Sequence, residues 1–247
     1  MQAQRQLVLV TLALTWLLFG SLSVRADALA KHDCFANEAM MRIRGCTKLL
    51  ESNNLDPATR STAYATRALG LSVTGRYSEA IADYDRALRI IPDYPVALNN
   101  RAWALFKLGR ISEAAPDVER SLQLDPTSPH AYDTRAHIRQ HQGRANAAFD
   151  DYQRAMRLGG SRMVKLYQCG LAGSGHYLGA QTGIITEQLE NALKQCAKSK
   201  SCDPLPPDEE CKAATSYVNG TFKLTHLSAD RHFESDPPCL AVCCPHV

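Results

Sequence analysis

The sequence predicts an all-α fold, a helical solenoid built from a tandem array of helix pairs. Glycines recur 34 residues apart, small residues recur at the same interval on either side of them, and prolines close two of the units. A fixed period of roughly 20 to 50 residues is typical of such arrays, in which neighbouring units bury each other's apolar faces. The recurring residues include Gly75, Gly109 and Gly143, then Ala68, Ala102 and Ala136, then Ala80, Ala114 and Ala148, and finally Pro92 and Pro126.

Each recurring residue type has a physical reason. Small side chains on facing helices let the two helices approach closely. The glycine ends the first helix in a left-handed conformation, and the proline stops the second helix. The pattern resembles the tetratricopeptide repeat (TPR), a pair of antiparallel helices per unit. The resemblance assigns three units, 61–94, 95–128 and 129–162, and Gly160 in place of a proline indicates that the array ends there.

The first 26 residues have the pattern of a secretory signal peptide. Arg5 precedes an apolar run over 7–19, and Val24 and Ala26 occupy the −3 and −1 places of a cleavage site. The run is shorter than the roughly 20 residues that cross a bilayer, which disfavours a membrane anchor. We expect cleavage after Ala26, with Ala30 as the alternative, and a periplasmic or secreted mature chain without a membrane span.

The composition of the mature chain excludes some partners. Loss of Arg5 and Arg25 leaves 26 of the 28 basic residues against 25 acidic ones, so neither nucleic acid nor an anionic membrane surface is indicated as a partner. Nine cysteines in an exported chain predict disulfides formed in an oxidising compartment. The odd number leaves at least one thiol unpaired or intermolecular.

Residues 31–60 are predicted to form a helical hairpin that caps the first unit. Cys34 and Cys46 are its only cysteines and would lie on its two facing helices, so we expect a disulfide between them. Such a bridge contributes about 2–4 kcal/mol. A zinc site is the weaker interpretation, because no histidine or cysteine nearby completes a ligand set at motif spacing.

After residue 162 the 34-residue period is lost and another pattern begins. Its residues are Leu166, Gln168, Leu171, Gly175, Tyr177, Gly179, Gly183, Ala192 and Leu193. The pattern is similar to that of the small three-helix peptidoglycan-binding domain of bacterial cell-wall enzymes. The resemblance assigns such a domain to 163–200, although Thr182 replaces the aspartate of the family. Its candidate binding residues are Gln168, Tyr177, Gly179 and Gly183.

This second module would have a small core filled by Leu171, Tyr177, Leu189 and Leu193. If it binds peptidoglycan, backbone donors of the glycine-rich turns and the aromatic face of Tyr177 would make the contacts. Because the core is thin, we expect disulfides to reinforce it. The four cysteines available, Cys169, Cys196, Cys202 and Cys211, allow three pairings.

Residues 201–247 are predicted to form a cysteine-rich irregular tail. It ends in Cys239, Cys243, Cys244 and His246, for which disulfides or a frayed terminus are the simpler interpretation and a metal site the minor one.

In the TPR family the first helix of each unit lines a concave groove. The resemblance places Trp103 and Phe106 at its centre as an apolar anchor, and packing of Trp103 against the neighbouring unit is an equal alternative. Some family members clamp a partner's terminal carboxylates, but only Asn100 matches that set, so this mode is not expected. The groove residues assigned are Asn99, Asn100, Trp103, Phe106, Lys107, His130, Asp133, His137 and His141.

One arginine and one aspartate recur in every unit. They predict a ladder of structural ion pairs, each contributing ~0–1 kcal/mol if exposed. The arginines are Arg67, Arg101 and Arg135, and the aspartates are Asp83, Asp117 and Asp151.

Catalytic motifs with a mechanism are missing from the sequence: it has no G-x-S-x-G elbow, no H-E-x-x-H helix and no Gly-rich phosphate loop. We therefore predict no enzyme and no cofactor. The favoured function is an exported protein–protein interaction adaptor or scaffold that binds a protein or peptide in the groove, with attachment to the cell wall through the second module.

Two alternatives stay open. One is a metal-binding protein or metal-dependent enzyme that uses Asp133, His137 and His141, which are spaced four and four on one helix face. The other is a structural subunit whose second module has lost its ligand. The sequence does not identify the partner.

Overall fold

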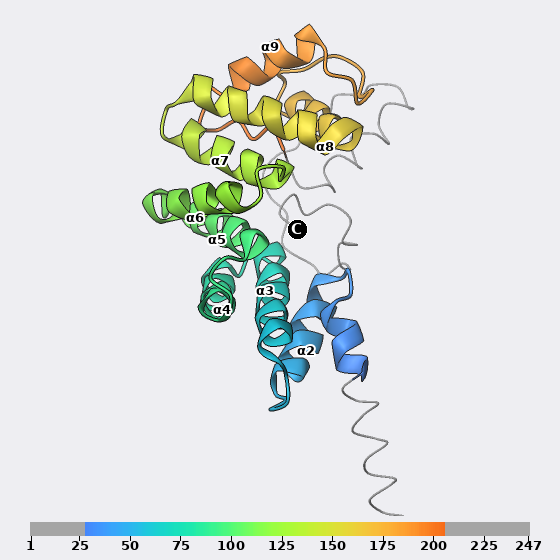
Figure 1. Cartoon of the computed structure of the whole chain (residues 1–247). Coiled ribbons are helices and arrows are strands. Elements are labelled where there is room, and N and C mark those ends of the chain that lie inside the picture. Colours follow the sequence, from blue (N-terminus) through green and yellow to red (C-terminus); the bar gives the residue numbers. More distant parts are fainter. Residues whose placement is uncertain (1–27, 206–247) are drawn as a thin grey trace, which may run out of the picture.

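The computed structural model describes residues 28–205 and is all-helical, with no strand in that range. The helices stack in chain order into a curved array, from α2 at one end to α9 at the other (Figure 1). A short helical stretch over 28–34 precedes α2. The bounds are α2 Ala39–Leu50, α3 Pro57–Val73, α4 Tyr77–Ile90, α5 Pro95–Lys107, α6 Ile111–Leu124, α7 Pro129–His141, α8 Ala145–Gly173 and α9 Glu187–Cys196.

Helices α3 to α8 form the three predicted antiparallel pairs, and the punctuating residues explain their ends. Proline opens α3, α5 and α7, where its fixed φ suits the first helical turn. Gly75, Gly109 and Gly143 follow these helices with φ of 76°, 74° and 76°, so the predicted left-handed glycines are confirmed.

Close approach of the paired helices is also confirmed. The alanines that recur on both helices of each unit are fully buried, at 0% exposure. Larger side chains fill the space beside them, with Tyr84, Val118 and Tyr152 at one recurring place and also fully buried. Small residues at the crossing and one large residue beside it therefore set the spacing in every unit.

The arginine–aspartate ladder joins the two helices of each unit. Arg67, Arg101 and Arg135 each donate two hydrogen bonds to the aspartate sixteen residues later, at 2.6–2.9 Å. The arginine side chains are only 16–23% exposed. The predicted ladder is confirmed, but its pairs are largely buried rather than exposed, so removal of one partner costs more than at a surface pair, because the other charge stays buried.

The N-terminal cap is closed by a disulfide between Cys34 and Cys46, whose Cα atoms are 4.3 Å apart. Both cysteines are fully buried and pack with Ala63 of the first unit. Helix α3 begins at Pro57, inside the stretch assigned to the cap, because the Asp56 side chain caps its first turn.

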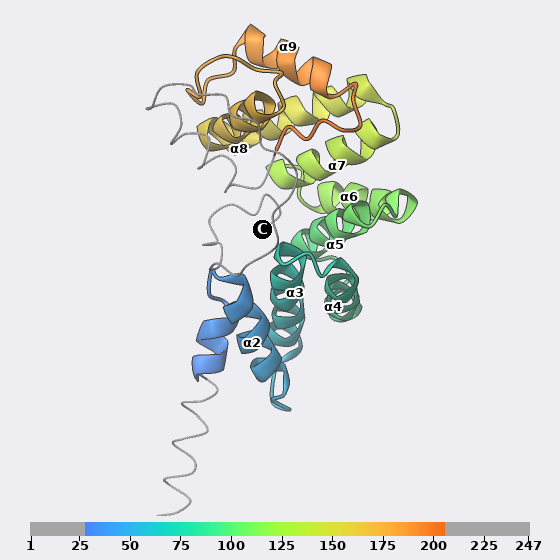
Figure 2. The same cartoon turned by 180° about the vertical axis from the view of Figure 1, so that it is seen from behind.

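The helix that ends the third unit breaks at Gly160, the residue at which the sequence predicts the end of the array. The element α8 consists of two helices joined at a kink there, where φ is 65° and ψ is −161°. Its C-terminal part packs beneath α9 (Figures 1 and 2). Within 163–200 the structure therefore has the end of α8 and α9, two helices where the resemblance implied three.

The predicted separate core of the second module is wrong. Leu171, Leu189 and Leu193 are fully buried and Tyr177 nearly so, as expected, but they belong to one cluster with Tyr152 of the third unit. A stretch this short has too few apolar residues for a core of its own, so it completes the core of its neighbour. Cys196 pairs with Cys202.

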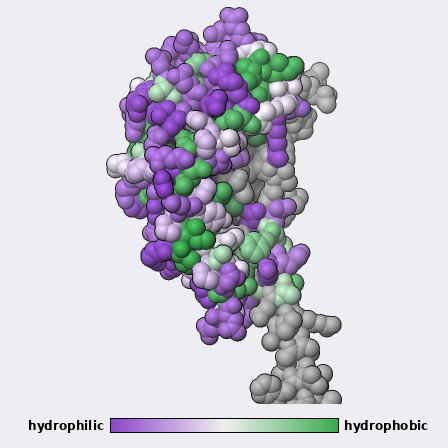
Figure 3. Space-filling view, viewed as in Figure 1, coloured by the Kyte–Doolittle hydropathy of each residue, from purple (hydrophilic) through white to green (hydrophobic). Residues whose placement is uncertain are grey.

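The signal peptide, Cys211, and the tail from residue 206 with Cys239, Cys243, Cys244 and His246 lie outside the described residues. No helix within 28–205 has the length and apolar character needed to span a bilayer. On the face shown in Figure 3, hydrophilic side chains predominate and hydrophobic ones form separate patches.

Candidate functional site

The central part of the groove is an aromatic platform on α5. Trp103 stacks on Phe106, with ring centroids 5.4 Å apart and an interplanar angle of 26°. The Lys107 ammonium lies 5.2 Å from the centre of the Trp103 ring. Both aromatic side chains are half-buried and Lys107 is exposed, so the platform offers an apolar surface beside a positive charge.

A hollow of about 310 Å³ lies one helical turn away, between the start of α5 and the α6–α7 loop. Asn99, Asn100 and His130 line it, together with Val96 and Ser128. The Asn99 amide nitrogen donates to Asn100 Oδ1 at 3.2 Å, whereas Asn99 Oδ1 is buried without a hydrogen-bond partner. Burial lowers the pKa of His130, which favours the neutral ring. The hollow therefore contains an acceptor whose hydrogen-bonding capacity is unused.

The third unit has a buried histidine at the place that Trp103 occupies in the second. His137 Nδ1 lies 2.9 Å from the Asp133 carbonyl oxygen and 3.5 Å from Asp133 Oδ2. His137 Nε2 lies 3.1 Å from Asp203 Oδ1. Burial favours the neutral ring, but the carboxylates of Asp133 and Asp203 outweigh it and raise the pKa of His137 to about 10. The imidazole is therefore charged at neutral pH.

Asp133 is itself fully buried and accepts a hydrogen bond from the Tyr167 hydroxyl. This bond ties the first helix of the third unit to the part of α8 beyond Gly160. The pair of Asp133 and His137 is thus surrounded by protein on both sides rather than open to a partner.

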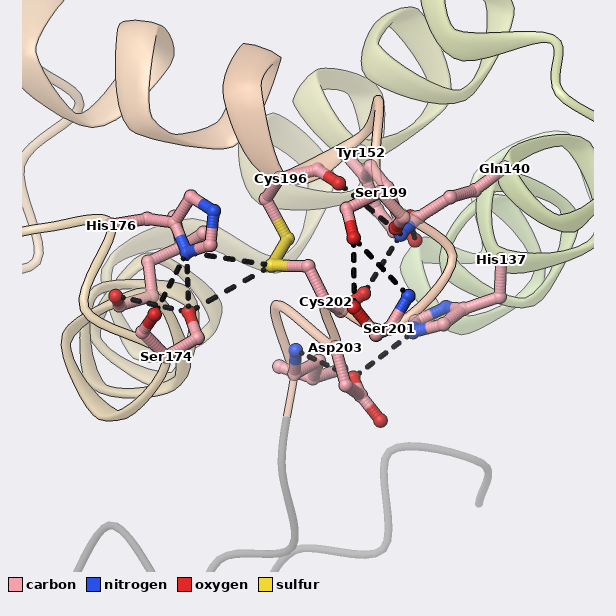
Figure 4. Close-up of a disulfide and its surroundings, with 12 residues drawn as sticks. His137, Gln140, Tyr152, Ser174, His176, Cys196, Ser199, Ser201, Cys202 and Asp203 are labelled. Carbon is pink, nitrogen blue, oxygen red and sulfur yellow. Dashed lines mark hydrogen bonds and ion pairs between the residues drawn. A yellow bond between two sulfur atoms is a disulfide. The ribbon is translucent and has the colours of Figure 1, made fainter.

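Gln140 holds a loop against the same face. Residues 196–205, here called the C-terminal loop, begin at the last residue of α9 and contain the Cys196–Cys202 disulfide (Figure 4). The Gln140 amide nitrogen donates to the carbonyl oxygens of Cys196 at 3.3 Å, Cys202 at 2.7 Å, and Ser199. The Gln140 carbonyl accepts from the Tyr152 hydroxyl at 2.5 Å. Every hydrogen-bonding atom of this buried side chain is used.

The open and closed parts of the groove meet at Trp103. Its ring packs edge-on against His137, with centroids 5.3 Å apart, and Phe106 packs edge-on against His141 at 4.8 Å. Trp103 therefore does pack against the neighbouring unit, as the alternative interpretation expects, through its contact with His137, but the ring stays half-buried.

Of the groove residues assigned to the third unit, His137 is buried and is bonded to Asp203 of the C-terminal loop, beside Gln140. The metal alternative is contradicted. No group of three or more histidine, cysteine, aspartate or glutamate side chains in residues 28–205 is placed to hold a metal ion. Both ring nitrogens of His137 are already bonded to protein oxygens, and His141 packs on Phe106.

The residues assigned to peptidoglycan binding hold a loop together. Gln168 is fully buried, donates to the Ile184 carbonyl at 3.1 Å and accepts from the Gly183 amide at 2.8 Å. Tyr177 is 4% exposed and donates to the Ala180 carbonyl. The prediction that the aromatic face of Tyr177 contacts a ligand is therefore wrong, because the ring is part of the core. Gly183 has a φ of 76°, as its turn requires, and Gly179 packs against the Tyr177 ring.

Sequence reasoning missed Asp203 and Tyr167 as parts of this site. Asp203 lies 66 residues from His137, in an irregular segment outside the repeat period. A buried aspartate and histidine four apart, both at groove places, are the only sequence signal, because such a charged pair requires further partners from elsewhere in the chain.

Two family models match the middle of the chain. One, described as TPR repeat, matches residues 74–109, and another, described as tetratricopeptide repeat, matches 95–128. The chain therefore contains tetratricopeptide repeats. The comparison with curated proteins gave no match.

Solved TPR structures also resemble the chain. The MamA protein is 15% identical with a TM-score of 0.49, covering 83% of this chain and 100% of MamA. YrrB, described as a TPR protein with an unusual peptide-binding site, is 20% identical with a TM-score of 0.44, covering 77% and 88%. The first TPR of Spaghetti (RPAP3), bound to the HSP90 peptide SRMEEVD, is 26% identical with a TM-score of 0.40, covering 43% and 84%.

Proposed function

We propose that the chain is an exported adaptor whose groove binds an extended segment of a partner protein over the second unit. One observation carries the proposal. At the third unit the groove already holds irregular backbone through the Gln140 side chain, whereas the matching face of the second unit borders a hollow with an unused acceptor.

The chemistry of the second unit defines the segment that fits. Asn99 Oδ1 is buried in the wall of the hollow, and once the amide turns toward the hollow it accepts a backbone N–H of the segment. One unit later, the Gln140 amide binds irregular backbone in a similar way, by donating to its carbonyls. Trp103 and Phe106 contact an apolar side chain, and Lys107 pairs with an acidic one. The expected segment is therefore extended, with an apolar residue close to an acidic residue.

The site supports binding rather than catalysis. His137 is the most strongly perturbed histidine of the groove, and its protonated, doubly hydrogen-bonded ring is a structural group rather than a general base.

Export is proposed from the signal-peptide pattern, and the two disulfides among the described residues fit an oxidising compartment. A mature N-terminus at Asp27 in the periplasmic or secreted fraction, found by mass spectrometry, tests it. Attachment to peptidoglycan stays a prediction from residue spacing, which sedimentation of the mature chain with purified sacculi tests.

Peptide binding is tested with the mature chain, 27–247, in which Trp103 is the only tryptophan. A library of twelve-residue random peptides is panned against this chain, and enriched peptides are titrated while Trp103 fluorescence is followed. Saturable change with peptides that pair an apolar and an acidic residue supports the proposal. No enrichment, or binding that leaves Trp103 fluorescence unchanged, contradicts it.

Variants then locate the site by anisotropy of a labelled peptide. Asn99→Leu is expected to weaken binding about tenfold through loss of one hydrogen bond to the backbone. Gln123→Ala, an exposed change on α6, serves as the matched control and leaves affinity unchanged. Equal affinities for wild type and Asn99→Leu would exclude the hollow as the binding site.

A further inference from the structure

Two arginines of the ladder, besides pairing with the aspartate sixteen residues later, also pair with an acidic residue sixteen residues earlier. Arg101 Nη1 lies 2.7 Å from Asp85 Oδ1, and Arg135 Nη1 lies 2.8 Å from Glu119 Oε2. Both acids are sixteen residues before their arginine, on the second helix of the preceding unit. In units two and three, each arginine therefore bridges one carboxylate of its own unit and one of the unit before.

The first arginine lacks this second carboxylate. Arg67 pairs with Asp83, but its Nη1 meets the Thr47 hydroxyl at 3.2 Å. Thr47 lies eight residues after the start of α2, and Asp85 lies eight residues after the start of α4. Thr47 therefore has the same position on α2 as Asp85 has on α4. Glu51, the residue sixteen before Arg67, pairs with Lys48 instead.

The charges around Arg67 are correspondingly unbalanced. Asp83 also accepts from Arg86 at 2.5 Å, so two guanidinium groups share one carboxylate. At the second unit the count is reversed, because Arg101 alone is bonded to two carboxylates, Asp117 and Asp85. We call each such group of bonded charges a step of the ladder. The first step, Arg67 and Arg86 with Asp83, has a net charge of +1, and the second, Arg101 with Asp117 and Asp85, has a net charge of −1.

A hollow of about 360 Å³ lies where the carboxylate is missing. It is formed by α2, α3 and α4, and Thr47, Ile43 and Leu71 belong to its wall. Three guanidinium groups and two carboxylates also line it, and since Arg76 pairs with Glu79, Arg67 and Arg86 with Asp83 leave a net charge of +1. Thr47 is exposed, so the hollow opens to solvent beside the half-buried Arg67. None of the groove residues belongs to it.

We infer that this hollow is a second binding site, which takes one carboxylate of an acidic side chain on a partner protein and so completes the ladder. A carboxylate fits because Asp85 and Glu119 place the same group on the same guanidinium edge in the later units. Its single negative charge balances the +1 of the step, whereas a dianionic phosphate reverses it. This site is separate from the groove and provides a second point of attachment.

The test uses propionate as the probe and the full mature chain with its disulfides intact. Saturation-transfer NMR from protein to propionate is recorded at constant ionic strength, with chloride as the balancing anion. Thr47→Asp supplies the missing carboxylate and is expected to abolish transfer while raising the Tm. Thr47→Val removes only the hydroxyl and is expected to retain transfer.

A second variant opens the corresponding position one unit later. Asp85→Thr frees the same edge of Arg101 but changes the net charge of that step only from −1 to 0, so any propionate transfer that it adds should be weaker than the transfer of the wild-type first step. No transfer in wild type, or equal transfer in wild type and Thr47→Asp, would overturn the proposal. Displacement of propionate by phosphate at lower concentration than by acetate would overturn the assignment to a carboxylate.

Discussion

The second and third units are both pairs of helices, but the side chains on their groove faces differ. Asn99 and Asp133 occupy the same place in their units, as do Trp103 and His137. In the second unit Asn99 Oδ1 is unused beside a hollow. In the third unit Asp133 Oδ1, His137 and Gln140 are bonded to residues from α8 and the C-terminal loop, and Asp133 Oδ2 lies 3.5 Å from His137 Nδ1. Side-chain identity at these places, rather than the repeat fold, determines whether the groove is open.

Charge explains the difference. A buried carboxylate such as Asp133 is costly unless it is paired, and the His137 beside it becomes charged and takes Asp203 as a further partner. Asn99 is neutral, so it needs no ionic partner from a distant segment. The unit with the buried charges is closed by other residues of the chain, whereas among the residues that the structure describes none bonds to Asn99 Oδ1.

The largest expected effect is the loss of Asp133. Asp133→Ala leaves the buried His137 with the half-exposed Asp203 as its only carboxylate and removes the acceptor of Tyr167, so the free energy of unfolding should fall by about 3–5 kcal/mol. Urea unfolding of the oxidised chain measures it. A loss no larger than that of Asn99→Ala, the same change one unit earlier, would show that the two faces are energetically alike.

The pH dependence of stability should come mainly from the third unit. The pKa of His137 is about 10 in the folded chain and 6.5 when unperturbed, so its contribution is complete below pH 6.5 and is lost as pH rises toward 10. The free energy of unfolding should fall with a slope of up to about 1.4 kcal/mol per pH unit in this window.

Unfolding curves between pH 6.5 and 9.5 measure this slope, and His137→Gln should remove most of it. A wild-type stability that is constant over the window, or a slope retained in His137→Gln, would contradict the charged imidazole.

Gln140→Leu should have an intermediate effect. It leaves the Tyr152 hydroxyl and three loop carbonyls without the amide partner, with an expected cost of about 1–3 kcal/mol. Faster hydrogen exchange at 199–203 should accompany it, because the C-terminal loop loses its anchor. Gln123→Leu, at an exposed position, is the control, and unchanged exchange in Gln140→Leu would mean that the disulfide alone holds the loop.

The smallest effect is expected at Asn99. Asn99→Ala removes an acceptor that has no partner and one hydrogen bond to Asn100, so stability should change by about 1 kcal/mol or less. Thermal unfolding measures it. A loss of several kcal/mol would indicate that Asn99 is bonded within the folded chain and not available to a partner.

The repeat period predicted the parts of this protein that neighbouring units determine. The buried alanines, the three turn glycines and the arginine–aspartate pairs all lie within one unit or its neighbour, where spacing in sequence fixes spacing in space. The Cys34–Cys46 bridge followed from the only two cysteines of a short hairpin.

The closed face of the groove was not predictable in this way. His137 and Asp203 are 66 residues apart, and the C-terminal loop has neither a period nor a helical pattern that would place it. The exposed carboxylate of a loop resembles any solvated surface charge in the sequence. The prediction for Tyr177 failed for the same reason. The family resemblance gave this residue a role in ligand binding, whereas contacts with the third unit, which the resemblance does not include, bury the ring in a shared core.

The Gly160 break and the segments after it also determine where this array can grow. A solenoid lengthens by inserting whole units, and an inserted 34-residue unit needs the same surface on both sides. The junctions before Pro95 and before Pro129 meet that condition, because the sixteen-residue spacing of arginine and acid continues across both. After residue 160 the next surface is already occupied by α9 and the C-terminal loop, so duplication of a unit there would produce a chain with two competing ends.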